Sequence, residues 1–341
     1  MNDGDEAHDG VPTITTVARL ANVSIASASR VLNGIRTNPD TFARVTEAAE
    51  AVGYAPNAAA RSLRSRRTGQ IAFAMPDVGN PVYTTMVGAI QEVARAHGLR
   101  LLLHSTGADR DDELAMVRDL KHRYVDGLIL ASLDLTDDHV AELGRSAAPV
   151  VVIGRPAKGT PVDTVHAHSR KGAAAAVRHL CATGRSRIAF VNGPEHTVPG
   201  ASRRLGYLDG LRSCGLERDD ALIEVASDFM AEPGRRAAEA LLDRVRPDAI
   251  LGANDLLAVG VLAALHERGL DVPGEVALAG MDDSALCELT WPSLTSVDLG
   301  SAARARIAAE LLLDRIEEPD REPRLVGVDP RLVRRASTGA A

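Results

Sequence analysis

Apolar residues recur with a helical period near the N-terminus of the chain. Ile14, Val17, Leu20 and Ala21 lie on one face of a two-turn helix, and Thr13 directly before them is a suitable N-cap. A helix this short is not stable in isolation. The pattern therefore predicts a short helix that packs against neighbours.

A second short helix follows after a very tight turn. Ser24 is a suitable N-cap for a helix over residues 25–32, and Gly34 lies just past its end. Asn22 stands at the turn itself, where asparagine tolerates left-handed backbone better than any residue except glycine. Two short helices joined in this way predict a helix-turn-helix. A helical hairpin that only packs is the alternative, and the turn alone does not decide between them.

A third helix is predicted from Asn38-Pro39, with proline at the first helical position. The apolar residues expected on its inner face are Phe42, Val45, Ala49 and Val52. The three helices should pack around these shared apolar faces into one small all-α bundle.

From Gln70 onward, short β-rich apolar runs alternate with alanine-rich helical segments. The runs are IAFAM, LRLLLHS, VDGLILAS and PVVVIG, and Ile71-Ala72-Phe73 returns later as Ile188-Ala189-Phe190. Such alternation predicts βαβ units with parallel strands, and the repeat predicts two α/β lobes. A crevice between the carboxyl ends of their strands would bind a ligand.

Composition and charge divide the chain further. A length of 341 residues exceeds what one core usually supports, so two or three domains are expected. The formal net charge is −7, yet residues 11–68 contain eight arginines and only three acidic residues. A basic head on an acidic body is typical of a protein that binds nucleic acid through one module.

The cysteines and the N-terminus exclude other classes of protein. Cys181, Cys214 and Cys287 are far apart in sequence without a C-x-x-C motif, so we expect small buried side chains rather than disulfides or zinc. The start MNDGDEAHDG is acidic, and no apolar run is long enough to span a membrane. We therefore expect a cytoplasmic protein without a membrane partner.

The stretches TITTVARLANVSIASASRVLNG and GYAPNAAARSLRSRRTGQIAFAMPDVGNP resemble the N-terminus of the LacI/GalR (lactose-repressor) family of transcriptional regulators. The resemblance covers nearly the whole chain and is strongest in residues 13–80. It implies a small all-α helix-turn-helix head plus an α/β periplasmic-binding-protein-like core of two doubly wound parallel-sheet lobes. Asn22 replaces the family's usual glycine, and Thr16 replaces its usual acidic capping-box residue.

The resemblance also implies domain boundaries, because the family's chain crosses three times between its lobes. The expected segments are a helix-turn-helix domain over 11–55, a hinge helix and linker over 56–68, lobe 1 over 69–162 with 294–320, and lobe 2 over 163–293 with 321–338.

The second helix of the head is the expected DNA-reading element. Arg30 should present its guanidinium to a guanine edge, and serine hydroxyls should contact phosphates or frame the helix. Ile25 and Ala26 can offer only apolar contact, for example to a thymine methyl group. The predicted DNA-binding residues are Ser24, Ile25, Ala26, Ser27, Ser29, Arg30, Asn33, Asn57, Arg61 and Leu63.

Three of these residues belong to the segment that resembles the family's hinge helix. Asn57 is a suitable N-cap, but eight residues are too few to be helical unaided. The resemblance implies that the segment becomes ordered on DNA beside its dimer mate, with Leu63 inserted into a minor-groove step. A helical linker with a solvated arginine run is the alternative.

Candidate effector contacts stand at predicted strand ends of both lobes. They are Asp77, Asn80, Tyr83, Arg203, Phe229, Asn254 and Asp282. In the family the corresponding arginine, asparagine and aspartate bind the effector, often a sugar, and an aromatic ring can pack on it. Helix capping is the alternative role, above all at Asn254 and Asp255. Gly154 and His168-Ser169 depart from the family's usual polar residues, so the effector's identity stays open.

No catalytic signature is present. The chain lacks G-x-G-x-x-G, Walker A and G-x-S-x-G motifs, and His166-x-His168, on a predicted strand, lacks a third ligand for a metal. We therefore expect no enzyme activity, metal or cofactor. The expected function is that of a homodimeric repressor that binds operator DNA and responds to a sugar-like or other small metabolite. A solute-binding protein and an α/β enzyme are the alternatives.

Overall fold

The computed structural model describes residues 12–35, 37–55, 67–155 and 159–339. It divides into two compact units, residues 1–68 and residues 69–341. Among the described residues, no helix combines the length and the apolar character needed to cross a membrane.

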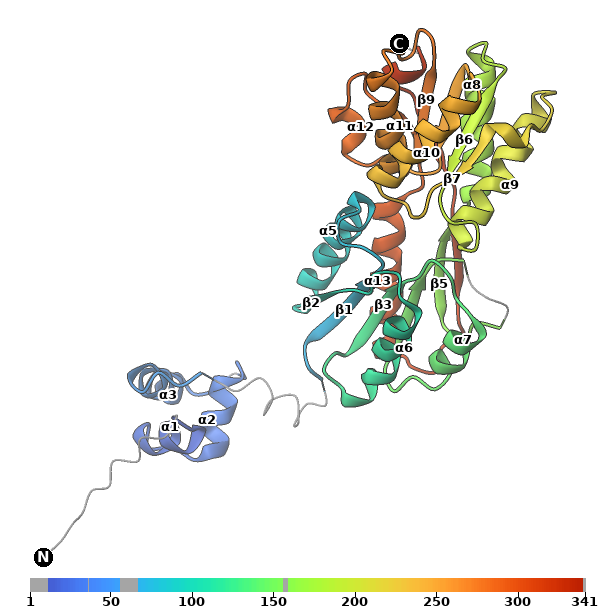
Figure 1. Ribbon diagram of the computed structural model, residues 1–341. Coiled ribbons are helices and arrows are strands. Elements are labelled where there is room, and N and C mark those ends of the chain that lie inside the picture. The colour runs from blue at the N-terminus through green and yellow to red at the C-terminus, as the bar shows by residue number, and fades with distance from the viewer. Residues whose placement is uncertain (1–11, 36, 56–66, 156–158, 340–341) are drawn as a thin grey trace, which may run out of the picture. The chain divides into compact units, whose positions relative to one another are not determined.

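The first unit contains the three predicted helices, α1 (Ile14–Leu20), α2 (Ile25–Leu32) and α3 (Pro39–Ala51) (Figure 1). Val17, Ala28 and Val45, one from each helix, are buried together in its core. Thr16 does take the place of an acidic capping-box residue, because the Thr13 backbone N–H donates to the Thr16 hydroxyl at 3.5 Å.

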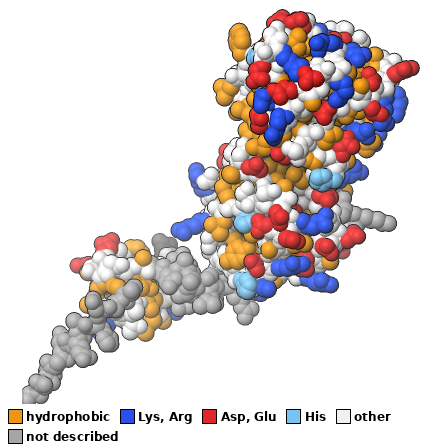
Figure 2. Space-filling model, viewed as in Figure 1, with side chains coloured by type: hydrophobic (Ala, Val, Ile, Leu, Met, Phe, Trp, Pro, Cys, Tyr) orange, Lys and Arg blue, Asp and Glu red, His pale blue; other side chains and the backbone are white. Residues whose placement is uncertain are grey.

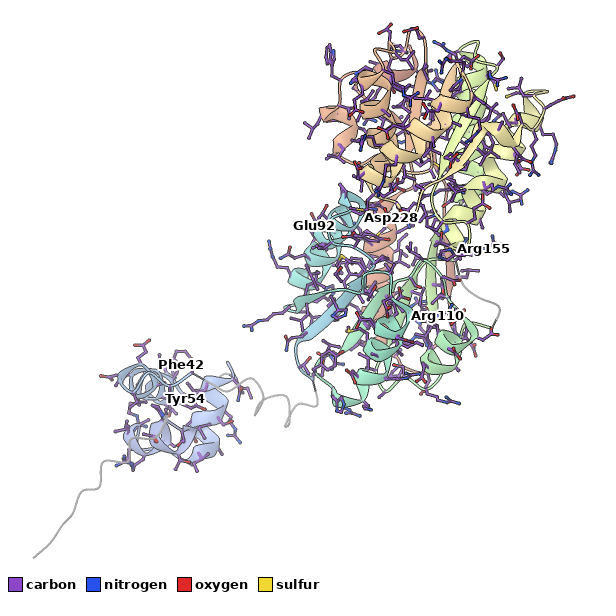
Figure 3. All side chains as sticks on the ribbon, in the orientation of Figure 1. Phe42, Tyr54, Glu92, Arg110, Arg155 and Asp228 are labelled. Carbon is purple, nitrogen blue, oxygen red and sulfur yellow. The ribbon has the colours of Figure 1, made fainter. Side chains whose placement is uncertain are left out.

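Two residues expected on the inner faces are exposed. Leu20 is 51% and Phe42 is 50% exposed, so their predicted burial is wrong (Figure 3). Leu20 is the last residue of α1 and Phe42 lies in the first turn of α3. The apolar period was right, but the core lies at the middle of α3, around Val45, Ala48 and Ala49.

The second unit consists of two lobes, each built on a six-stranded sheet. The first sheet has the order β11-β5-β4-β3-β1-β2 and the second has β12-β10-β9-β8-β6-β7. All neighbouring strands are parallel except β10 and β12. The first sheet contains β1 (Gln70–Met75), β2 (Arg100–Ser105), β3 (Gly127–Ala131), β4 (Val150–Ile153), β5 (Asp163–Ala167) and β11 (Leu325–Val328). The second contains β6 (Ile188–Asn192), β7 (Ile223–Val225), β8 (Ala249–Gly252), β9 (Ala277–Met281), β10 (Thr295–Asp298) and β12 (Arg331–Val333).

Helices cover both faces of the first sheet. Alternate residues of β1 separate two cores: Ile71 and Phe73 pack with α5 and α13, whereas Ala72 and Ala74 face the α6 and α7 side. The helices of this lobe are α5 (Pro81–Ala96), α6 (Arg110–Asp119), α7 (Asp137–Leu143) and α13 (Ser301–Glu317), with a 3-10 turn at Leu120–His122. This is the doubly wound lobe that the sequence predicted.

The second lobe repeats the plan. Its helices are α8 (Ser169–Ala182), α9 (Val198–Ser213), α10 (Ala231–Arg244), α11 (Asp255–Glu267) and α12 (Leu286–Leu289), with 3-10 turns at Asp220–Leu222 and Ala336–Thr338. Glycines let α9 approach α8 closely, since a Cβ at Gly206 would lie 2.2 Å from the Arg170 carbonyl oxygen. The close approach lies in the middle of α9, the helix that carries Arg203.

The three crossings between the lobes lie later in the chain than predicted. β5 pairs with β4 in the first sheet, β10 pairs with β9 in the second, and β11 pairs with β5 in the first. The boundaries placed at 162, 293 and 320 are therefore wrong, each by one strand. Alternation along the chain identifies strands, but membership of a sheet depends on long-range pairing.

Two smaller predictions also need correction. β5 ends at Ala167, so His168 lies outside the strand and is the N-cap residue of α8. Cys287 is buried as expected, whereas Cys181 and Cys214 are only half-buried.

Candidate functional site

The start of α2 is held by two serine hydroxyls. The Ser24 side chain accepts from the Ser27 backbone N–H at 3.1 Å, and the two hydroxyl oxygens are 2.9 Å apart. Asn22, in the preceding turn, has a φ of 51°, the left-handed conformation predicted for it. Cap and turn together fix the direction in which α2 leaves the turn.

The exposed side of α2 combines an apolar start with a cation. Ile25 is 49% exposed, and Ala26, Arg30 and Asn33 are also exposed. The Arg30 guanidinium has no hydrogen-bond partner within the described part of the chain. These four side chains are accessible to a partner molecule.

Ser29 is placed differently from the other predicted DNA-binding residues of α2. It is only 8% exposed, and the Asn33 side-chain amide donates to the Ser29 hydroxyl at 3.3 Å and to its carbonyl oxygen at 2.7 Å. Ser29 therefore frames the end of the helix, which is one of its two predicted roles. Asn57, Arg61 and Leu63 lie outside the described residues.

A cavity of about 1010 Å³ lies between the two lobes of the second unit. It is lined by residues that follow β1, β3, β4 and β5 in the first lobe and β8, β9 and β10 in the second. Arg155 and Asp228 lie where the lobes meet (Figure 3). The carboxyl ends of both sheets thus form the cavity, as expected for doubly wound lobes. All seven predicted effector residues line it: Asp77, Asn80, Tyr83, Arg203, Phe229, Asn254 and Asp282.

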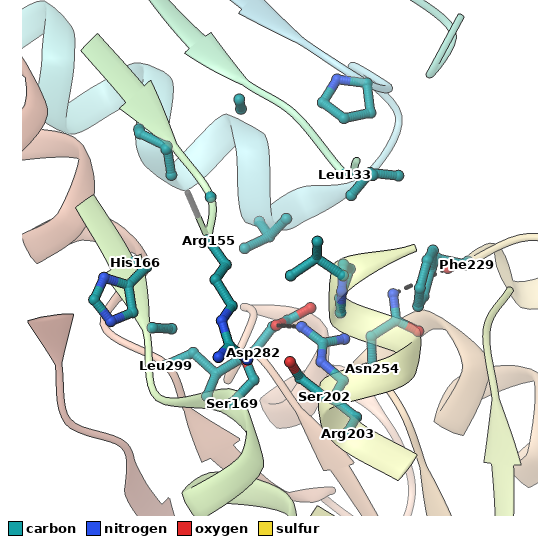
Figure 4. Close-up of a pocket in the computed structure, with 18 of the residues that line it drawn as sticks. Leu133, Arg155, His166, Ser169, Ser202, Arg203, Phe229, Asn254, Asp282 and Leu299 are labelled. Carbon is teal, nitrogen blue, oxygen red and sulfur yellow. Dashed lines mark hydrogen bonds and ion pairs between the residues drawn. The ribbon is translucent and has the colours of Figure 1, made fainter. Parts of the chain in front are cut away.

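Asp282 and Arg203 form a buried ion pair on the second-lobe side of the cavity (Figure 4). The Nη2 atom of Arg203 lies 3.1 Å from Oδ1 of Asp282, and the Nη1 atom of Arg203 donates to the Ala253 carbonyl oxygen at 2.6 Å. The guanidinium carbon also lies 5.9 Å from the centroid of the Phe229 ring. Three predicted residues therefore form one connected group.

The backbone at Asp282 is strained. Asp282 has a φ of 109° and Asp283 has a φ of 50°, and residues other than glycine rarely adopt positive φ values. The Asp282 N–H donates to the Val297 carbonyl oxygen at 2.8 Å, which holds the conformation. Strain of this kind is concentrated at functional sites, where it aims a side chain.

A second carboxylate lies behind Asp282. Asp255 accepts hydrogen bonds from the Ser284 N–H and the Ser296 hydroxyl, both at 2.6 Å. Burial and the nearby Asp282 charge raise the pKa of Asp255 to about 6. Burial also raises the pKa of Asp282, against the opposing charges of Arg203 and Arg304.

Asn254 has the capping role that the sequence left open as an alternative. Its side-chain oxygen accepts from the Leu257 N–H at 2.9 Å, and its amide nitrogen donates to the Phe229 carbonyl oxygen at 3.0 Å. Asn254 therefore caps α11 and also holds the loop that contains Phe229 through a hydrogen bond to its carbonyl oxygen. It still lines the cavity, where its amide has a second N–H to donate.

The first lobe contributes Asp77, Asn80 and Tyr83. Asp77 accepts from the Gly79 N–H at 2.7 Å, and Asn80 caps α5 by accepting from the Val82 N–H at 3.1 Å. Tyr83 is 9% exposed, and burial raises the pKa of its hydroxyl. A neutral phenol beside the cavity can both donate and accept a hydrogen bond.

Gly154 leaves no room for the carboxylate that the resemblance would place there. A Cβ at this position would lie 2.9 Å from the Ser132 carbonyl oxygen. This close contact is consistent with glycine at this position. The first-lobe side of the cavity therefore lacks the carboxylate that the resemblance implies.

Four arginines that line the cavity, Arg155, Arg170, Arg178 and Arg304, were not predicted from the sequence. Arg155 directly follows Gly154 at the end of β4, so the rule that selected the other strand-end residues could have found it. Arg304 lies within α13, one turn after Ser301 and one turn before Ala308, both buried. A cation on the apolar face of an alanine-rich helix was the available signal.

His166 and His168 have ring centroids 5.1 Å apart in an edge-to-face arrangement. Burial and the charges of His168, Arg155 and Arg304 lower the pKa of His166. Within the described ranges there is no group of three or more His, Cys, Asp or Glu side chains that could hold a metal ion.

Comparison with known proteins gives matches to both units. Residues 13–57 match the family model described as bacterial regulatory proteins, lacI family, and residues 177–338 match that of a periplasmic binding protein-like domain. The chain is 34% identical to catabolite control protein A of Priestia megaterium over 299 residues, 85% of this chain and 90% of that protein. It is also 34% identical to the HTH-type transcriptional regulator CelR of Thermobifida fusca over 336 residues, 96% of this chain and 98% of that one.

A solved structure is similar over nearly the whole chain. The transcriptional regulator CelR in complex with cellobiose matches with a TM-score of 0.73 and 32% identity, covering 96% of this chain and 99% of the other. The predicted combination of a helix-turn-helix head and a periplasmic-binding-protein-like core is therefore confirmed.

Proposed function

This chain belongs to the lacI family of bacterial regulatory proteins, and on that premise we propose that it is a homodimeric repressor controlled by a small metabolite. Like its relatives, it is a DNA-binding regulator of transcription and not an enzyme. The proposal adds three parts: a pseudo-palindromic operator, a second copy of the chain, and an effector in the cavity between the lobes.

The observation that carries the proposal is the exposed side of α2. The Arg30 guanidinium is exposed there and has no hydrogen-bond partner among the residues that the structure describes, and this group can pair bidentately with O6 and N7 of a guanine. Ile25 and Ala26 offer apolar contact to a thymine methyl group, while Ser24 and Ser27 cap the helix next to the phosphates. The hinge residues Asn57, Arg61 and Leu63 would add minor-groove contacts.

The charge of the second unit supports DNA binding through the head alone. Figure 2 shows acidic and basic side chains interspersed over the visible face of both lobes. Such a surface lacks the single-sign field that attracts a polyanion. The arginine surplus of residues 11–68 then provides the electrostatic attraction to phosphate.

The cavity supports a small effector with hydroxyl groups. The Arg203–Asp282 pair and Asn254 supply donors and acceptors, and Phe229 and Tyr83 supply ring faces. The CelR structure contains cellobiose, which sets a precedent for a sugar-like ligand in a related protein. An effector that binds one arrangement of the lobes better than the other would change the operator affinity.

Exposed apolar side chains support a dimer. Leu289 is 79% and Trp291 is 88% exposed next to α12, and Leu102 and Leu103 are 40% and 50% exposed on the edge strand β2. α12 and β2 lie on the same side of the second unit (Figure 1). A second copy covering that side would bury both patches.

The dimer is tested by sedimentation of the full-length chain and of Trp291→Glu. We expect the wild type to sediment as a dimer and the variant to shift toward monomer, because a charge would be buried in the interface. A control at the exposed Tyr124, Tyr124→Glu, should leave the dimer intact. A monomeric wild type at micromolar concentration would remove the dimer from the proposal.

The DNA part is tested by selecting binding sites from a pool of random duplexes with the full-length chain. We expect a two-fold symmetric consensus that binds at least a thousandfold more tightly than a scrambled duplex at the same salt concentration. Recovery of no consensus, with and without metabolites present, would contradict the proposed function.

A further inference from the structure

The cavity between the lobes is richer in cations than a neutral sugar requires. Its lining includes Arg155, Arg170, Lys171, Arg178, Arg203 and Arg304, together with His166 and His168. Arg170 pairs with Asp209, Lys171 pairs with Asp329, and Arg178 is exposed. Arg203 is paired, because it contacts both Asp282 and the Ala253 carbonyl oxygen. The partners of Arg155 and Arg304 therefore bear on what kind of ligand fits.

Arg304 has only one hydrogen-bond partner in the described part of the chain. Its Nε donates to the Leu299 carbonyl oxygen at 3.1 Å, the two Nη groups have no hydrogen bond to a described residue, and Arg304 lines the cavity. Arg304 is half-buried, and Asp282, the carboxylate whose charge acts on it most, already accepts from Arg203. Burial lowers the pKa of Arg304, so the surroundings disfavour this charge in the absence of a ligand.

Arg155 extends from the first lobe toward the same place. Figure 4 shows its side chain reaching from the end of β4 toward Asp282 and Ser202. No hydrogen bond or ion pair within the described ranges engages its guanidinium. Arg155, at the end of β4, and Arg304, on α13, both belong to the first lobe, and neither forms an ion pair with a carboxylate within the described ranges.

The remaining carboxylates of the cavity are engaged elsewhere. Asp209 lies 2.6 Å from Arg170, while Asp77 and Asp228 each accept from a backbone N–H of their own loop, at 2.7 and 2.8 Å. Closure of the lobes would remove water from Arg155 and Arg304, and burying such charges without a partner is unfavourable. An anion between them would supply the missing acceptors in the bidentate geometry that guanidinium prefers.

We propose that the effector is an anionic sugar derivative, a polyol carrying a carboxylate or a phosphate, and that Arg304 and Arg155 bind its anionic group. The inference rests on the proposed function and specifies its ligand. Asp282, Arg203 and Asn254 bind the hydroxyl groups, so the two halves of the ligand have separate partners.

The test compares matched compounds on the full-length chain by thermal shift and calorimetry. Each neutral sugar of a panel of pentoses, hexoses and disaccharides is paired with its aldonic or uronic acid and with its monophosphate. Inorganic phosphate and sulfate are included alone. We expect a carboxylated or a phosphorylated member to bind at least tenfold more tightly than its neutral partner, and the two arms identify which anion is used.

Variants locate the anion. Arg304→Met, which replaces the guanidinium with an apolar unbranched side chain, should weaken the binding of the anionic ligand at least tenfold. Arg306→Met on the same helix, where Arg306 pairs with Glu92 at 2.8 Å, is the matched control and should leave affinity unchanged. Arg155→Met is a second variant at an exposed position, and it keeps the test decisive should Arg304→Met not fold.

A neutral sugar that binds as tightly as its anionic partners would overturn the anionic assignment while leaving the proposed regulator intact. Inorganic phosphate that binds as tightly as every sugar phosphate would also overturn it, since it would indicate an adventitious ion only. Binding by no member of any series would overturn it as well, and the duplex selection would then decide separately whether the chain regulates transcription.

Discussion

Arg30 and Ile25 share the exposed side of α2, but only Arg30 can form hydrogen bonds with a base edge. Replacing Arg30 with alanine should relax discrimination at one base pair of each half-site by about 1–3 kcal/mol while leaving folding intact. Competition binding with operators substituted at single positions measures this. The control is Arg95→Ala at an exposed position of α5, in the other unit. Unchanged discrimination between operator sequences in the Arg30 variant would contradict the role of Arg30 in reading a base edge.

Asp255 gives a prediction about pH. Its pKa is raised to about 6, so the folded protein favours the protonated form more than the unfolded chain does. The stability contributed by this group is therefore complete below the carboxyl's ordinary pKa and is lost as the pH rises through 6. Asparagine stays neutral throughout. The free energy of unfolding of Asp255→Asn relative to wild type should rise by about 1–3 kcal/mol between pH 4 and pH 7.

Chemical denaturation of both proteins at several pH values measures that difference. The hydrogen bonds from Ser284 and Ser296 lower the pKa of Asp255 and are already included in its net raised value. A difference between variant and wild type that is the same at every pH would contradict the raised pKa.

Strand ends could be located from the sequence, and this is why Asp282 and Asn254 were found. Arg203 lies within α9, and the resemblance to the family identified it. The residues with which these side chains interact could not be located from the sequence. The ion pair joins residues 79 positions apart, and the strained φ of 109° at Asp282 depends on the packing of β9 beside β10. Arg304 escaped because it lies in the middle of a helix, and only its contact with Leu299 and the neighbouring cavity distinguishes it from a solvated arginine.

The left-handed turn between α1 and α2 should contribute to the stability of the head. Asn22 has a φ of 51°, so Asn22→Ala should destabilise the head by about 1 kcal/mol, whereas Asn22→Gly should not. Native-state amide exchange of the head residues in the full-length chain measures both. Equal protection in the two variants would show that the left-handed turn does not limit the stability of the head.

The elements themselves were well predicted, because helical and strand periods are local properties. β1, for example, begins at Gln70 as the apolar run indicated. Sheet membership is not local. β5 and β10 pair with the strands directly before them, whereas β11 pairs with the distant β5, and the sequence does not show after which strand the chain leaves a sheet.

The two compact units predict separable binding activities for the whole molecule. A chain reduced to residues 69–341 should lose DNA binding and keep ligand binding within a factor of two, because the cavity is formed by that unit alone. Calorimetry with the ligand and anisotropy with operator DNA measure the two activities. Loss of ligand binding in the shortened chain would mean that the cavity depends on the head.

Occupancy of the cavity should change the affinity of the protein for operator DNA, and a thermodynamic cycle measures this coupling. The operator dissociation constant is measured with and without saturating ligand, and the ligand dissociation constant with and without operator, at one salt concentration. Linkage requires the two ratios to be equal, and we expect a factor of about 5 to 150. A ligand that binds in the cavity while the operator affinity stays the same would contradict the account.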